Sequence, residues 1–420
     1  MNHEEKIPFW RDDRILKIVI QVALVAIVVT IFIILGSNLA RNFQRLRLNF
    51  GFGFLFDSDR PASFKIGDSP IDYSATDPYN RAILVGLLNS LRVMINGIVL
   101  ATLVGITVGI SRLSENWLVR QIATVYVETI RNTPLLLQLF FWYFAVFLRL
   151  PRIENPLIFL DSIFLSNRGM YIPFPTGTLQ TWLSLGFLIL SAILGIILWR
   201  RQTQVIVQQG ASGRVFEIGL IGIAIAAILV IIFGLDWQQP QFDRTALTFE
   251  GGLNLSPEFA TLLVGLTIYT AAFIAEVVRA GIQSVNKGQW EAARALGLKP
   301  GLIMRLVIFP QALRVMIPPL TSEFLNLAKN SSLAVAIGYT DIYAVSSTIS
   351  NQTGKSVEML IVVMTTYLIF NLIIASGMNW FNRSVQLKER GIYRLGDRCS
   401  LYLNCYYQGI IQNYSVEYSK

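Results

Sequence analysis

The feature that most constrains this chain is a series of stretches, each about 20 residues long, that are apolar and almost free of charge. An α-helix of about that length crosses the roughly 30 Å hydrocarbon core of a bilayer. Transmembrane β-strands differ, because they alternate polar and apolar residues over about ten positions. The sequence therefore predicts an all-α polytopic membrane protein with about eight transmembrane helices. The expected spans are residues 15–37, 83–111, 119–148, 178–199, 215–235, 258–281, 310–340 and 356–381.

Composition agrees with this class. Hydrophobic residues make up 53% of the 420 residues and charged residues 15%, whereas a typical soluble domain has about 25% charged residues. The net charge is +9, but the basic residues are dispersed among short loops, and no basic run with interleaved aromatic residues indicates nucleic-acid binding. The two cysteines, Cys399 and Cys405, have no histidine nearby and predict neither a disulfide framework nor a metal site.

Basic residues near the span ends predict the orientation of the chain. They follow the second span and lie in the fourth-to-fifth and sixth-to-seventh connections, at Arg112, Arg120, Arg200, Arg201, Arg214, Lys287, Arg294, Lys299 and Arg305. These connections fall on one side, which the positive-inside rule places in the cytoplasm together with both termini. The long loops at 38–82 and 149–177 are then expected on the outer face.

Catalytic chemistry is poorly represented. The only histidine is His3, which excludes Ser-His-Asp and Cys-His catalysis and histidine-based metal sites. The fragment "NQTGKS" ends like a phosphate-binding loop, but Ile349 stands five residues before Gly354, where that motif requires glycine. We therefore expect no catalysis, cofactor or metal in this chain.

A short charged segment at 289–314 interrupts the apolar sequence. The segment "EAARALG" predicts a helix at about 288–297 that stops at Gly297, since Pro300 and Gly301 prevent its continuation. A helix of roughly ten residues is marginal alone in water, so it needs a surface to pack against. Its small apolar side chains, at helical spacings, are Ala292, Ala293, Ala295 and Leu296.

This face favours docking into a groove of another protein. Glu291 complements the helix dipole, and Arg294 adds a charge at the other end. The alternative is an amphipathic connector lying on the membrane, which would favour larger apolar anchors and several lysines.

The stretch "EAARALGLKPGLIMRLVIFP" resembles the EAA loop of permease subunits from ATP-binding-cassette importers. The pattern is matched at Glu291, Ala292, Ala293, Gly297 and Pro310, while Val307 and Phe309 replace the usual Ile and Leu. The resemblance implies a MetI-like transmembrane fold and a coupling helix, including Arg294, that fits a cleft on a cytoplasmic ATPase.

Two further stretches resemble the polar amino-acid branch of these permeases. "VYVETIRNTPLLLQLFFWYF" (125–144) carries Arg131, Thr133, Pro134 and Gln138 of the branch signature, with Asn132 where glycine is common. "LAKNSSLAVAIG" (327–338) is similar to another stretch of that branch.

The remainder resembles the longer general L-amino-acid permeases, which pair with a second, related permease. The implied organisation is an anchor helix and outer loop at 1–79, a permease domain at 80–389 and a cytoplasmic tail at 390–420 without predicted structure. Within the domain, the resemblance covers 80–145 and 257–389, and 149–256 is an insert with extra helices.

Ionisable groups inside spans are costly and usually face protein or a water-filled path. Glu276 and Arg279 are three residues apart and predict a structural pair, as do Glu128 and Arg131. The candidate structural or gating residues are Glu128, Arg131, Pro134, Gln138, Glu276 and Arg279.

Pro318 and Pro319 predict an interruption of the seventh span, where transporters often build polar sites from unwound backbone. A polar cluster follows, and its mixture of charges, amides and hydroxyls suits the ammonium and carboxylate of an amino acid. Packing at a subunit interface is the alternative. The candidate substrate-pathway residues are Glu323, Asn326, Lys329, Asn330, Ser331 and Ser332.

The expected function is that of a permease subunit of an ATP-driven amino-acid importer in the inner (plasma) membrane. By resemblance it would work with ATPase subunits, a second homologous permease and an extracytoplasmic amino-acid-binding protein. The alternative is an ion-coupled secondary transporter of small polar solutes, which usually has inverted repeats. We detect no convincing repeat.

Overall fold

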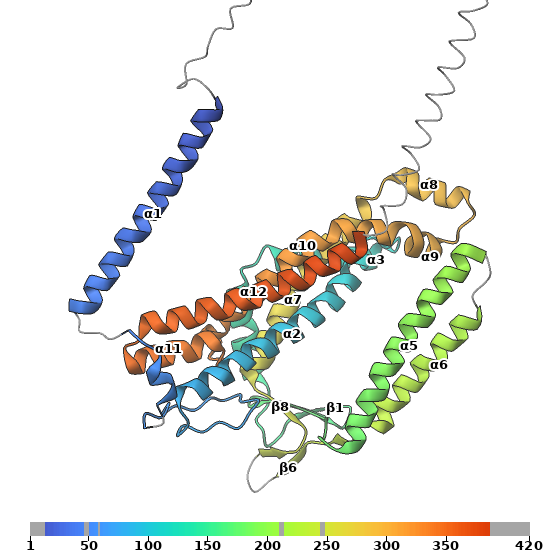
Figure 1. Cartoon of the computed structure of the whole chain (residues 1–420). Coiled ribbons are helices and arrows are strands. Elements are labelled where there is room, and N and C mark those ends of the chain that lie inside the picture. Colours follow the sequence, from blue (N-terminus) through green and yellow to red (C-terminus); the bar gives the residue numbers. More distant parts are fainter. Residues whose placement is uncertain (1–12, 46–49, 58, 210–213, 244–247, 387–420) are drawn as a thin grey trace, which may run out of the picture.

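The computed structural model describes residues 13–45, 50–57, 59–209, 214–243 and 248–386. His3, Cys399, Cys405 and the tail at 390–420 therefore lie outside the described residues. The described chain forms a long helical bundle, a separate helical hairpin and an isolated N-terminal helix (Figure 1). The helices are α1 (Asp13–Arg45), α2 (Tyr79–Ser111), α3 (Trp117–Arg131), α4 (Leu135–Phe140), α5 (Leu179–Gln209), α6 (Arg214–Leu229), α7 (Pro257–Gln283), α8 (Lys287–Ala295), α9 (Pro300–Ile303), α10 (Phe309–Asn330), α11 (Ile342–Thr353) and α12 (Ser356–Gln386).

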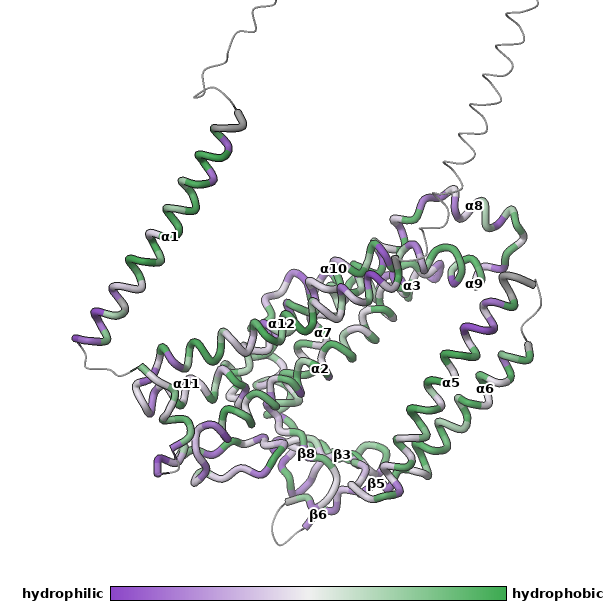
Figure 2. Tube along the Cα trace, in the orientation of Figure 1, coloured by the Kyte–Doolittle hydropathy of each residue, from purple (hydrophilic) through white to green (hydrophobic). Residues whose placement is uncertain are grey.

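Seven stretches of the described chain are helical, long and apolar enough to cross a membrane, and they coincide with seven of the predicted spans. Figure 2 shows their apolar residues running along α1, α5, α6 and α12. The remaining predicted span, 119–148, is divided between α3 and α4, with π- and 3₁₀-helical turns up to Arg149. The break falls at Asn132-Thr133-Pro134 because proline has no N–H and disfavours helical backbone at the residue before it.

The seventh span differs from its prediction. Helix α10 continues through Pro318 and Pro319, so the expected interruption at that point is wrong. Irregular backbone lies instead at its two ends, as a π-helical turn at Met304–Ile308 and a 3₁₀ helix at Ser331–Ile337. Membrane helices tolerate proline where neighbouring groups re-satisfy the freed carbonyls.

Helices α2 and α7 form the tightest pair in the bundle, and two glycines of α2 make this possible. A Cβ atom on Gly105 would lie 2.6 Å from the Cβ of Ile274, and one on Gly109 would lie 2.8 Å from the carbonyl oxygen of Ala275. Small residues four apart allow helix backbones to approach closely in lipid. The fully buried side chains around this contact include Ile274 and Ala271.

The segment 149–256, which the resemblance predicts to be an insert, contains short strands and the hairpin of α5 and α6. One antiparallel sheet has the strand order β1-β2-β3-β8, and the pairs β4–β5 and β6–β7 lie beside it. The strands are β1 (Leu157–Phe159), β2 (Ile163–Ser166), β3 (Gly169–Ile172), β4 (Phe174–Pro175), β5 (Trp237–Gln238), β6 (Gln241–Asp243), β7 (Thr248–Glu250) and β8 (Leu253–Leu255). Because β8 leads directly into α7, this sheet joins the insert to the bundle.

Candidate functional site

Helix α8 (Lys287–Ala295) forms where the sequence predicts a helix at about 288–297, although it begins one residue earlier and ends two residues earlier. The Asn286 side chain accepts a hydrogen bond from the Gly288 N–H at 2.8 Å and caps the first turn. At the other end, Gly297 adopts φ +73°, the left-handed conformation that glycine reaches without steric cost. The Leu298 N–H donates to the carbonyl oxygen of Ala293 at 3.3 Å, so the chain reverses before α9. The result is a short helix at one end of the bundle (Figure 1).

One face of α8 is held by the bundle and the other is free. Ala293 is only 3% exposed and belongs to a buried cluster with Ile303, Ile308 and Ala312. The expectation that Ala293 contributes to a docking face is therefore wrong, because this side chain faces inward. Leu296, by contrast, is 79% exposed. Other exposed residues of this segment include Glu291, Ala292, Arg294 and Ala295.

An ion-pair network joins α2, α3 and α7 near the same end of the bundle. The pair predicted from spacing is present, since Arg279 Nε donates to Glu276 Oε2 at 3.1 Å. Arg112 also pairs with Glu276, and its Nη2 lies 3.4 Å from Glu128 Oε1. The predicted pairing of Glu128 with Arg131 is wrong, because Arg112 takes the Glu128 carboxylate and the Arg131 guanidinium lies 5.2 Å from the Phe273 ring centroid.

A cavity of about 380 Å³ lies between α7 and α10, beside the end of α3. It brings together Arg131, Glu276 and Glu323, which come from three different helices. The other lining residues are Phe273, Val277, Ala280, Gly281, Ser284, Val315 and Pro319. The cavity therefore presents one cation and two carboxylates between apolar walls, a combination that can hold a small zwitterion.

Only Glu323 of the predicted polar cluster lines this cavity. Glu323, Asn326 and Asn330 recur every three or four residues along α10 and so share one face. Ser331 and Ser332 have another use, because their hydroxyls donate to the carbonyl oxygens three residues before, at 2.8 Å each. These two hydroxyls thus satisfy the end of α10.

Gln138 and Pro134 form the break between α3 and α4. The Gln138 amide donates to the carbonyl oxygens of Ile130 and Thr133, at 3.0 Å each, and so bridges the interruption that Pro134 causes. Gln138 is buried. This geometry gives both residues a structural place, away from the cavity lining.

Sequence reasoning used Arg112 only as a marker of orientation. Its side chain is 9% exposed and holds two carboxylates, so it organises the network. The available signal was its position directly after the last residue of α2 rather than within a loop. Among the described residues, no group of three or more His, Cys, Asp or Glu side chains is placed to hold a metal ion.

The chain is similar to a known protein family and to several named proteins. Residues 220–387 match the model of the family described as "Binding-protein-dependent transport system inner membrane component". The chain is 42% identical, over 90% of its length and 94% of the relative's, to the general L-amino acid transport system permease protein AapQ of Rhizobium johnstonii. It is 43% identical to the putative amino-acid ABC transporter permease protein YhdX of Escherichia coli, over 89% of this chain and 94% of that one.

A third relative is the glutamate/glutamine/aspartate/asparagine transport system permease protein BztB of Rhodobacter capsulatus. It is 39% identical over 90% of this chain and 96% of its own length. Identity at this level over nearly the whole of both chains includes the insert and the hairpin, which the shorter family match only partly covers. The protein belongs to the family of inner-membrane permease components of binding-protein-dependent ABC transport systems, and it is a multi-pass inner-membrane protein.

Proposed function

We propose that this chain is a permease subunit of an ATP-driven importer that moves amino acids through the inner membrane. The observation that carries the proposal is the exposed outer face of α8 on a helix whose inner face is locked into the bundle. The transport systems named for the three relatives carry amino acids, which supports the substrate class. In this proposal the chain needs no cofactor and catalyses no reaction, because a partner ATPase uses the ATP.

The buried contacts of α8 provide a route for mechanical coupling. Ala293 and Trp290 pack in the same cluster as Ile308, Ala312 and Met316. Ala312 and Met316 belong to α10, which also carries Glu323 at the charged cavity. A displacement of α8 by closing ATPase subunits would therefore move α10 and change the shape of the cavity. Alternating access requires such a switch between two packed conformations.

The substrate pathway is proposed to pass the charged cavity. Arg131 would receive the carboxylate of an amino acid and Glu323 its ammonium group, since both side chains line the same space. Asn326 and Lys329 lie in the same apolar span as Glu323 and are exposed in this single chain. Exposed polar groups at membrane depth need a protein or aqueous neighbour, which supports a second, homologous permease against this face.

The proposed orientation places α8 and both termini in the cytoplasm. An extracytoplasmic amino-acid-binding protein would then deliver substrate at the opposite end, where the short strands and the loop at 50–78 lie. The basic residues of the connections around α8 support this orientation.

Uptake assays test the proposal. The chain is expressed with its partner subunits in cells lacking amino-acid permeases, and uptake of labelled L-amino acids is measured for Glu291→Lys and Gly297→Asp. Both variants should insert normally, lose at least about 90% of uptake and lose the ATPase on purification, because a charge is reversed or introduced on the docking face. Glu115→Lys, a charge reversal in the exposed α2–α3 connection, is the matched control and should transport normally. Full uptake with retained ATPase in both α8 variants would contradict the coupling role.

A further inference from the structure

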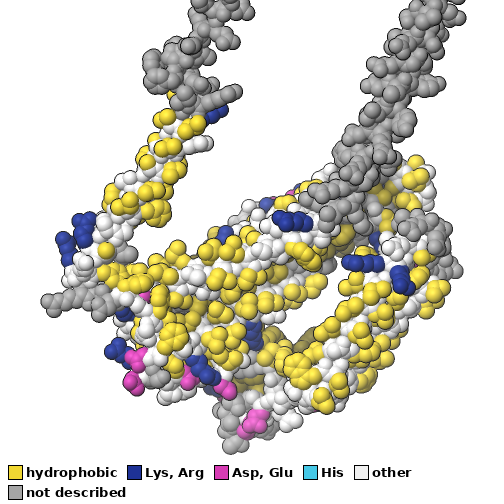
Figure 3. Space-filling view, viewed as in Figure 1, with side chains coloured by type: hydrophobic (Ala, Val, Ile, Leu, Met, Phe, Trp, Pro, Cys, Tyr) yellow, Lys and Arg dark blue, Asp and Glu magenta, His cyan; other side chains and the backbone are white. Residues whose placement is uncertain are grey.

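The hairpin of α5 and α6 stands away from the bundle and leaves long apolar faces uncovered. Figure 3 shows hydrophobic side chains along the visible faces of the hairpin and of the bundle opposite, with an open gap between them. Trp182, Leu183 and Ile189 of α5 are each more than 60% exposed. In a membrane this gap must contain hydrocarbon or another apolar helix, because water there would leave these side chains hydrated.

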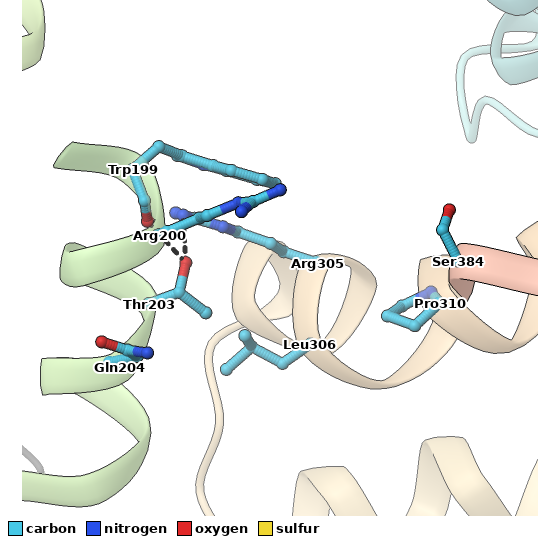
Figure 4. Close-up of a pocket in the computed structure, with 8 residues that line it drawn as sticks. All are labelled: Trp199, Arg200, Thr203, Gln204, Arg305, Leu306, Pro310 and Ser384. Carbon is cyan, nitrogen blue, oxygen red and sulfur yellow. Dashed lines mark hydrogen bonds between the residues drawn. The ribbon is translucent and has the colours of Figure 1, made fainter. Parts of the chain in front are cut away.

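A polar contact holds the hairpin to the bundle at the end near α8. Arg305 Nη2 donates to Thr203 Oγ1 at 2.8 Å, and the guanidinium carbon lies 4.7 Å from the centre of the Trp199 ring (Figure 4). Both Nη atoms lie 3.5 Å from Gln202 Oε1. These partners are all neutral, and Arg305 Nε is buried without a hydrogen-bond partner in the described chain. A cation is thus positioned without a carboxylate within ion-pair distance among the described residues.

A cavity of about 840 Å³ lies directly beside this contact. Its lining residues are Trp199, Arg200, Thr203, Gln204, Arg305, Leu306, Pro310 and Ser384. None of them is acidic, and two are arginines from opposite sides of the cavity (Figure 4). Arg200, like Arg305, forms no ion pair with a carboxylate in the parts of the chain that the structure describes.

The cavity combines a basic site that can bind an anion with a neighbouring apolar wall. Two guanidinium groups can bind the non-bridging oxygens of a phosphate. The Thr203 and Ser384 hydroxyls donate to the carbonyl oxygens of Trp199 and Phe381, so the two arginines supply the donors of the site. Leu306 and Pro310 add apolar surface to the wall of the same cavity, and acyl chains in the gap would cover the exposed faces of α5. Basic pockets between membrane helices on the cytoplasmic side suit anionic headgroups, and they discriminate against zwitterionic lipids, whose ammonium group two arginines repel.

We propose that this cavity is a binding site for an anionic glycerophospholipid of the cytoplasmic leaflet, which seals the hairpin to the bundle next to the coupling segment. The leaflet assignment rests on the orientation in the proposed function, but occupancy of the cavity does not. Because Arg305 and Pro310 lie in the chain that leads from α8 into α10, the lipid would stiffen the connection through which α8 moves α10.

Lipid retention tests the site independently of transport. The assembled complex is purified from nanodiscs containing equal amounts of phosphatidylglycerol and phosphatidylcholine with matched acyl chains, and bound lipid is identified by native mass spectrometry. Wild type should retain phosphatidylglycerol preferentially, and Arg200→Ala should lower that retention about five-fold, as expected for one basic residue at an anionic surface. Arg201→Ala is the matched control, because Arg201 is exposed on the same helix and does not line the cavity.

Further variants separate binding from hairpin docking. Arg305→Lys keeps the charge and should retain more lipid than Arg305→Ala, which also removes the contact with Thr203. Equal retention in wild type and Arg200→Ala, equal binding of the two lipids, or displacement of the lipid by millimolar inorganic phosphate would overturn the proposal. A helix of the second permease found in the cavity would overturn it too. Loss of uptake in Glu291→Lys with unchanged lipid retention would support coupling and leave the lipid site standing.

Discussion

At the scale of single residues, three positions matter for reasons that their chemistry makes clear. Gly297 is needed for its backbone conformation, because its φ of +73° is one that other residues rarely adopt. Lack of space is not the reason, since an added Cβ atom would meet nothing within 4 Å. Arg112 is needed for its charge, since it holds two carboxylates from a largely buried position. Ala293 is needed for its small size, as it fits among Ile303, Ile308 and Ala312.

Replacing Gly297 separates backbone strain from surface chemistry. Gly297→Ala should strain the turn by about 1 kcal/mol, whereas Gly297→Asn should cost less, because asparagine tolerates the left-handed region. Hydrogen exchange of the α8 amides is the measurement, and we expect about five-fold faster exchange in the alanine variant. Equal exchange in wild type and Gly297→Ala would show that the left-handed turn does not stabilise α8.

Removing Arg112 should destabilise the bundle. Arg112→Ala leaves Glu128 without its described partner and Glu276 with Arg279 alone, and we expect a loss of about 1–3 kcal/mol, since both carboxylates remain partly solvated. The thermal unfolding midpoint of the complex in nanodiscs measures this. Arg60→Ala removes a pair in which the arginine is 74% exposed and should change the midpoint little. Similar midpoints for the two variants would argue against the network.

At the scale of elements, the α2–α7 pair and the α5–α6 hairpin differ in how much of their surface packs against protein and how much faces lipid. Helices α2 and α7 approach through Gly105 and Gly109 and bury each other's faces. The hairpin helices pack on one another and leave most of their surface to lipid. The first pair is therefore sensitive to one added methyl group, whereas the second is not.

A methyl group added to α2 tests this difference. Gly105→Ala should cost about 1–3 kcal/mol, because the new Cβ would lie 2.6 Å from Ile274 and force α2 and α7 apart. Gly222→Ala in α6 meets nothing within 4 Å and should leave stability unchanged or slightly raised. Unfolding midpoints of the two purified variants make the comparison, and a larger loss for Gly222→Ala would contradict the packing described.

At the scale of the whole molecule, helix α8 lies at one end of the bundle with its outer face exposed, and the short strands lie at the other end (Figure 1). The end of the hairpin that contacts Arg305 lies near α8. Helix α10 runs between the two ends of the bundle with Glu323 partway along. This arrangement supports alternating access driven from α8.

Accessible cysteines test the orientation. With Cys399 and Cys405 replaced, Leu296→Cys should react with a membrane-impermeant maleimide only in inside-out vesicles, and Leu160→Cys only in right-side-out vesicles. Both positions are more than 70% exposed, so in vesicles that contain no ATPase subunits only the membrane limits access. Labelling of the two cysteines from the same side would contradict the proposed topology.

The sequence by itself determined the apolar spans and the limits of α8, because hydrophobic length and the signals at Asn286 and Gly297 act locally. It also determined the family, since the spaced motif around Glu291 stands in an unbroken stretch. Only the tertiary structure decided that Ala293 faces inward and that Arg112 rather than Arg131 pairs with Glu128. It likewise decided that Arg131 meets Glu323 in one cavity. Such contacts join residues far apart in the chain, and helical packing sets them in ways that neither spacing nor composition records.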